Sequence, residues 1–119
     1  MDVSVYFNPA CSNCRTAEAI LREKGVEAGY VRYLDDAPTR EELEDVLRKL
    51  GTDDPRAIVR TKEPEYAELG LAQAGREELL AAMAAHPILI QRPIVIRGDR
   101  AIVARPPDRL IPFLEETAG

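Results

Sequence analysis

The chain has 119 residues, of which 45% are hydrophobic and 31% are charged, and its formal net charge is −5. This length and composition indicate one globular domain with a single core. The negative charge argues against non-specific binding to nucleic acid, and no apolar stretch approaches the roughly 20 residues of a membrane span.

The compartment is predicted from the N-terminus and from cysteine usage. The first strand is expected to begin at Val3 with no basic segment before it, so we expect no secretion signal. Two closely spaced cysteines in an unexported chain favour the reducing cytoplasm.

The first predicted strand covers residues 3–7 and ends at Asn8-Pro9. Proline cannot donate a hydrogen bond to a neighbouring strand, and Asn-Pro favours a turn. Apolar residues at helical spacing follow, which predicts a helix with Ser12 or Asn13 as its N-cap.

Cys11 and Cys14 therefore fall at a strand-to-helix junction. Free N–H groups and the positive end of the helix dipole should stabilise a thiolate at Cys11, and Arg15 should add a positive charge. A structural disulfide would close too short a loop to constrain the unfolded chain strongly, and a zinc site would need about four ligands, where the chain adds only His86 and carboxylates. A Cys-x-x-Cys beside a strand–helix–strand pattern is more typical of redox or nucleophilic thiol chemistry.

Further along the chain, residues 28–34 are predicted to form a second strand, parallel to the first. Thr39 and Glu42 have the spacing of a capping box, which predicts a helix that ends at Gly51. Residues 53–86 keep a helical pattern that prolines interrupt.

The C-terminal third is predicted to form strands at 94–96 and 101–103, followed by a helix that begins near Pro107. The resulting order is β-α-β, a helical insertion and then β-β-α. This order predicts a thioredoxin-like α/β fold with a mixed sheet.

Residues 1–119 are expected to form a single domain of this kind, with the helical insertion at about 39–86. In this fold a proline precedes the third strand and faces the nucleophile loop, which makes Pro93 a candidate cis-proline. Any single X–Pro bond is cis in only about 5–6% of cases, so this prediction rests on the fold.

Short motifs spread over nearly the whole chain carry a family resemblance. They are Asn8-Pro9-Ala10-Cys11 with Arg15, Val59-Arg60, Glu68-Leu69-Gly70-Leu71, the block from His86-Pro87 to Arg92-Pro93-Ile94, and Ala104-Arg105-Pro106. Together they resemble the arsenate reductases of the glutaredoxin-like ArsC family. The His-Pro…Arg-Pro block is the specific part, because Cys-x-x-Cys alone occurs widely.

The resemblance implies that Cys11 attacks arsenate and that Arg60, Arg92 and Arg105 bind the oxyanion, with Asn8 as a further substrate contact. Guanidinium groups suit this task, because their planar, permanently charged donors pair with oxyanions in a bidentate manner. We interpret the only histidine as a helix-end residue and not as a catalytic group.

The chain departs from many relatives at two positions. Phe7 stands where they have a histidine, and Cys14 stands where glutathione-dependent members commonly have serine. Cys14 could therefore act as an internal resolving thiol that attacks Cys11 and leaves a disulfide for thioredoxin or glutaredoxin. We expect a monomer in arsenic detoxification that needs an external thiol reductant but no bound cofactor or metal.

Two other functions are compatible with the same motifs. Spx-type regulators share the fold and the His-Pro…Arg-Pro block, and they use a cysteine pair as a redox switch while they bind RNA polymerase. Arg105 favours the reductase, because the regulators generally lack it. A family member with a reactive thiol but without arsenate turnover is the third possibility.

Overall fold

The computed structural model describes residues 3–117. The chain forms two compact units. We call the first, made by the segments up to Tyr33 and from Arg92 onward, the sheet unit. The second, Leu34–Gln91, is the helical unit, and it contains the whole of the insertion expected at about 39–86.

The sheet unit is built on four short strands in the order β2-β1-β3-β4. They are β1 (Val3–Tyr6), β2 (Ala28–Val31), β3 (Ile94–Arg97) and β4 (Arg100–Val103). β1 pairs in parallel with β2 and antiparallel with β3, and β3 pairs antiparallel with β4. The prediction of a mixed sheet is confirmed.

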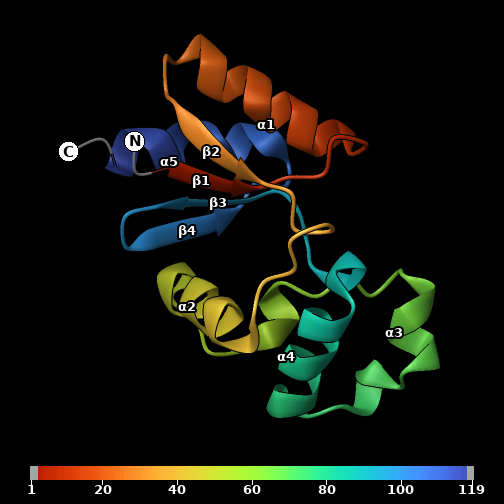
Figure 1. Ribbon diagram of the computed structural model, residues 1–119. Coiled ribbons are helices and arrows are strands. Elements are labelled where there is room, and N and C mark those ends of the chain that lie inside the picture. The colour runs from red at the N-terminus through yellow and green to blue at the C-terminus, as the bar shows by residue number, and fades with distance from the viewer. Residues whose placement is uncertain (1–2, 118–119) are drawn as a thin grey trace. The chain divides into compact units, whose positions relative to one another are not determined.

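Two helices cover one face of this sheet (Figure 1). They are α1 (Ser12–Glu23), which connects β1 to β2, and α5 (Leu110–Thr117), which follows a short 3₁₀ turn at Pro107–Arg109. Apolar side chains of both helices pack with those of β1 and β3 in one core, and Cys11 and Cys14 belong to it. This is the predicted thioredoxin-like arrangement.

The second strand is shorter than predicted. It ends at Val31, whereas the sequence predicted that it would continue to residue 34. The N–H of Tyr33 bonds to the Val31 carbonyl at 2.9 Å, so the chain turns there and leaves the ladder.

The helical unit consists of short helices: α2 (Arg40–Leu50), η1 (Pro55–Ala57), α3 (Pro64–Glu68), η2 (Leu71–Gln73), α4 (Arg76–Ala85) and η3 (Pro87–Leu89). The predicted capping box of Thr39 and Glu42 is present, and Gly51 ends α2 with a left-handed φ of 86°. His86 is the C-cap of α4. Within residues 3–117, no helix is long and apolar enough to cross a membrane.

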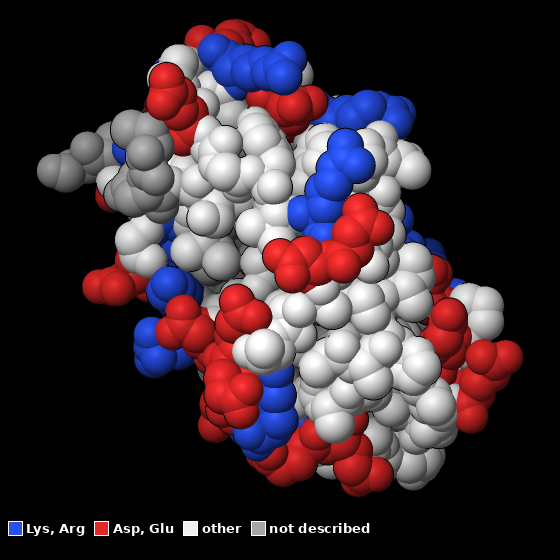
Figure 2. Space-filling view, viewed as in Figure 1, with Lys and Arg blue, Asp and Glu red and all other residues white. Residues whose placement is uncertain are grey.

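The charged side chains are mixed in sign. On the face shown in Figure 2, Lys and Arg are interspersed with Asp and Glu, and they do not gather into one continuous basic area. Together with the net charge of −5, this distribution does not favour binding to a polyanion.

Candidate functional site

The loop between β1 and α1 is organised by Asn8. Its carbonyl accepts the N–H of Cys11 at 2.9 Å, and its side-chain Oδ1 accepts the N–H of Ala10 at 3.0 Å. The turn leaves Cys11 itself as the N-cap of α1, so the prediction of Ser12 or Asn13 at that position was wrong. The thiol thus occupies the place where a capping side chain normally meets the free N–H groups of the first turn.

The surroundings of Cys11 favour its thiolate. Its side chain is 8% exposed, and burial by itself raises its pKa. The backbone N–H of Cys14, the Arg92 side chain and the Cys14 thiol act in the opposite direction, and together they bring the pKa of Cys11 below its ordinary value of 9.0. At a given pH, a larger fraction of Cys11 is therefore present as the nucleophilic thiolate than for an ordinary cysteine.

Cys14 has the opposite character. Its side chain is fully buried, and burial raises its pKa to about 12, helped by the negative charge of Cys11. The Asn8 N–H and Arg92 lower this pKa, but they do not outweigh burial. Cys14 therefore keeps its proton at neutral pH and donates it in a hydrogen bond to the Cys11 sulfur. Both cysteines are free thiols and form no structural disulfide.

Two of the three predicted arginines lie together at this loop. Arg92 acts on both thiols and precedes Pro93 through a cis peptide bond, as predicted. The Nη1 of Arg105 donates to the Arg92 carbonyl at 2.9 Å. The bond from Arg105 to Pro106 is also cis, which the sequence did not predict. The sheet unit thus combines the thiols with the side chain of Arg92 and holds Arg105 against the Arg92 main chain.

The other two predicted basic residues have local partners. Arg15 donates from Nη1 to the Pro9 carbonyl at 3.0 Å, so it holds the far side of the nucleophile loop. Arg60 belongs to the helical unit, where its Nη1 lies 3.4 Å from Oε1 of Glu63 and its N–H bonds to the Leu89 carbonyl at 2.7 Å. The role of Arg15 in stabilising the thiolate and the role of Arg60 in binding the oxyanion stay predictions.

Phe7 is buried and packs edge-on against the Tyr30 ring with centroids 5.2 Å apart. The thiolate must therefore be stabilised without an imidazole at this position. Among residues 3–117, no cluster of three or more histidine, cysteine or acidic side chains could hold a metal ion.

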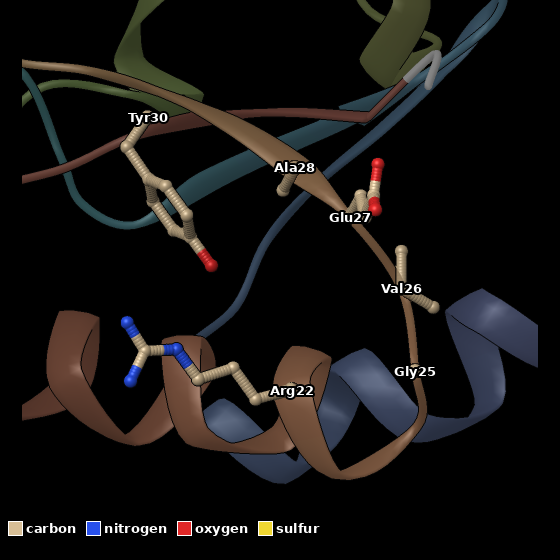
Figure 3. A pocket seen from close by; sticks show the side chains of 6 residues that line it. All are labelled: Arg22, Gly25, Val26, Glu27, Ala28 and Tyr30. Carbon is tan, nitrogen blue, oxygen red and sulfur yellow. The ribbon is translucent and has the colours of Figure 1, made fainter.

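A cavity of about 580 Å³ lies elsewhere in the sheet unit. Figure 3 shows Tyr30 of β2 and Arg22 of α1 pointing into the same opening, whereas Glu27 points away. The lining residues are Arg22, Gly25, Val26, Glu27, Ala28 and Tyr30. None of them is a predicted site residue, and the cavity contains no thiol.

Sequence reasoning missed one residue of the site. Tyr33 lies fully buried, just beyond the end of β2, and its phenol interacts electrostatically with Cys14, Cys11 and Arg92. The only signal in the sequence was an aromatic residue at the predicted carboxyl end of a strand. Such a position also suits ordinary core packing.

The comparison with known proteins identifies the family. The ArsC family profile matches residues 6–113. The chain belongs to the ArsC family. The arsenate reductase of Neisseria meningitidis serogroup A is 41% identical over 107 residues, which cover 88% of this chain and 92% of that protein. The arsenate reductase of Haemophilus influenzae is 40% identical over 116 residues, which cover 96% of this chain and 100% of that protein.

A solved structure of an ArsC relative agrees with the fold. The arsenate reductase from Vibrio cholerae superposes with a TM-score of 0.90 at 40% identity, and the match covers 94% of this chain and 97% of that one. The likeness extends over both units, so the family resemblance is not limited to the Cys-x-x-Cys loop.

The two thiols of this ArsC protein are expected to differ sharply in alkylation by iodoacetamide. Cys11 should react with a midpoint below pH 9.0, because its thiolate is stabilised, whereas Cys14 should stay unmodified in the folded protein. Mass spectrometry after alkylation at a series of pH values measures both. Cys14→Ala should move the Cys11 midpoint to higher pH, since the thiol that donates to Cys11 is lost. Equal reactivity of the two cysteines would contradict this assignment.

Proposed function

We propose that the protein is a thiol-dependent arsenate reductase with Cys11 as its nucleophile. The observation that carries the proposal is a stabilised thiolate at the start of α1, next to Arg92, whose carbonyl also holds Arg105. The relatives named arsenate reductase, at about 40% identity over most of the chain, support arsenate as the oxyanion.

In the first step, the Cys11 thiolate attacks the arsenic(V) atom of arsenate. A sulfur–arsenic bond forms, and an arsenic–oxygen bond breaks, so that the leaving oxygen departs as hydroxide and is protonated to water. Arg92 and Arg105 stabilise the charge on the remaining oxygens. Within residues 3–117, Arg105 donates to the Arg92 main-chain carbonyl through Nη1, which leaves its other N–H groups for the substrate. Arg60 and Asn8 are further candidates for contacts with the oxyanion.

In the second step, Cys14 loses its proton and attacks the Cys11 sulfur. The disulfide forms, the sulfur–arsenic bond breaks, and its electron pair stays on arsenic, which leaves as arsenite. The first step prepares this one, because the adduct removes the negative charge of Cys11 that raises the pKa of Cys14. The Asn8 N–H and Arg92, which both lower that pKa, remain in place.

The remaining disulfide has to be reduced by two electrons from an external dithiol, thioredoxin or glutaredoxin. If Cys14 did not resolve the adduct, glutathione would attack Cys11 in its place. The two routes differ in the protein thiol that they need, and this difference makes them separable by experiment.

Arsenate-dependent NADPH oxidation tests the activity and the role of Cys14 together. The wild type should turn over with a thioredoxin system, and Cys14→Ser should lose that turnover, because serine cannot form the disulfide. A glutathione–glutaredoxin system run in parallel shows whether an external thiol can replace Cys14. Retention of full thioredoxin-coupled turnover by Cys14→Ser would contradict the internal resolving role.

Absence of arsenate-dependent oxidation in both systems would contradict the reductase itself. The regulator would then become the leading alternative, and the next experiment would be capture of RNA polymerase by the purified protein.

A further inference from the structure

The buried hydroxyl of Tyr33 has no role in the mechanism above. Its side chain is fully buried, and its ring stacks on Tyr6 with centroids 6.1 Å apart and an interplanar angle of 18°. Among the described residues, no atom forms a hydrogen bond of normal geometry with the hydroxyl. The Asn8 side chain interacts with it and favours its ionised form, although the two groups do not meet that geometry.

An unpaired buried hydroxyl is costly, because the group has lost its water without gaining a partner. A phenylalanine would fill the same stacked position on Tyr6 without that cost. The hydroxyl is therefore free to donate a hydrogen bond to a group that becomes an acceptor in another state of the site.

The placement of Tyr33 limits what this partner can be. The strand pairing puts Tyr6 opposite Val31, and the Phe7 N–H bonds to the Val31 carbonyl at 2.9 Å, so the end of β2 lies next to the start of the nucleophile loop. The hydroxyl therefore reaches the loop from inside the core. The hydroxyl has no access to solvent, and an oxyanion would enter the site from the solvent side.

The groups around the Tyr33 hydroxyl differ in how strongly they affect its pKa. Among the ionisable neighbours of the phenol, Arg92 has the strongest effect on its pKa, followed by Cys14 and then Cys11. Burial raises the pKa of Tyr33 to about 12, so its hydroxyl keeps its proton at any working pH and can donate it. In the resting enzyme the Cys14 thiol is protonated and directed at Cys11, so it offers the phenol no charged acceptor.

We propose that Tyr33 is a positioning residue for the resolving step, whose hydroxyl donates a hydrogen bond to the sulfur of Cys14 when that thiol ionises. The inference rests on the resolving role proposed for Cys14. Tyr33 contacts no substrate and leaves the attack by Cys11 unaffected. It acts only after the adduct has neutralised Cys11, when the proton of Cys14 must leave and the new thiolate lies buried in the core.

A small aromatic disulfide that releases a coloured thiolate separates the two steps without arsenate. Attack by Cys11 releases the first equivalent and forms a mixed disulfide, and attack by Cys14 on the Cys11 sulfur then releases the second. Tyr33→Phe should leave the first phase unchanged and slow the second by about tenfold, the effect of raising the Cys14 pKa by one unit. The pH dependence of the second phase should move upward by the same amount.

Tyr30→Phe is the matched control, because this phenol lies on β2, shortly before Tyr33 in the chain, but its charged neighbours are Glu18 and Arg22. Both phases should match the wild type in that variant. Thermal unfolding of Tyr33→Phe should occur at the wild-type temperature or above it, since the substitution removes an unpaired buried group.

An unchanged second phase in Tyr33→Phe would overturn the proposal, and so would an equal slowing of both phases, which would indicate a purely structural role. Because the readout needs no arsenate, it stays valid if the protein does not reduce arsenate. A wild type that released only one equivalent would instead disprove the resolving role of Cys14 and the Tyr33 proposal with it.

Discussion

Cys11→Ser is expected to abolish arsenate turnover, with a loss in kcat of more than about 10³-fold, as for removal of a nucleophile in other enzymes. The N–H of Cys14 and the Arg92 side chain stabilise a thiolate but cannot bring a serine hydroxyl into its ionising range. The variant also lacks the sulfur that Cys14 must attack. NADPH oxidation coupled to thioredoxin or glutaredoxin measures the loss.

The fold should survive this substitution, because position 11 is the N-cap of α1 and serine is a favoured N-cap residue. Loss of activity can therefore be separated from unfolding by circular dichroism. Ser12→Ala, an exposed neighbour on the first turn, is the control and should keep wild-type turnover. Full turnover by Cys11→Ser would make the proposed adduct untenable.

Arg92→Gln is expected to lower kcat/KM for arsenate by about 10²–10³-fold, the typical cost of losing one donor that stabilises a developing oxyanion. Two effects combine in this variant. The pKa of Cys11 rises, because both the hydrogen bond and the charge of Arg92 are lost, and the oxyanion loses one guanidinium. The first effect should be recovered at higher pH, where the thiolate re-forms, whereas the second should persist.

A profile of kcat/KM against pH therefore separates the two roles of Arg92. The contact with Arg105 should be retained, since Arg105 donates to the main-chain carbonyl of residue 92. Arg100→Gln is the matched control: this arginine is 57% exposed and pairs only loosely with Glu116, at 3.5 Å. Equal losses in the two variants would show that Arg92 has no special role in the reaction.

Most of the fold could be predicted from sequence pattern, because its elements have strong local signals. The capping box at Thr39, the left-handed glycine after α2 and the alternating apolar strands each have one dominant physical cause. The length of β2 was missed, because Tyr33 and Leu34 look like strand residues in isolation. The strand ends through a backbone turn that leaves no mark on the residue types.

The candidate site shows a similar division. Cys11, Cys14, Arg92 and Arg105 carry recognisable chemistry, and the structure brings them together. The stabilised thiolate of Cys11 was predicted from its position at the start of the helix, whereas the raised pKa of Cys14 was not, because it depends on how far the fold buries that side chain. For the same reason Tyr33 was not singled out from its residue type: its hydroxyl is buried, and within residues 3–117 it forms no hydrogen bond of normal geometry.

The strand order also governs how the protein can form on the ribosome. β1 and β2 are synthesised early. The antiparallel neighbour of β1, which is β3, emerges only after the whole helical unit has been made. Until then one edge of β1 is open, and such edges are the usual starting points for aggregation. Arg92 emerges just ahead of β3, so the thiol pair also meets its stabilising cation late in synthesis. The nascent chain therefore carries Cys11 without the contribution of Arg92, which the thiolate gains only when the sheet is complete.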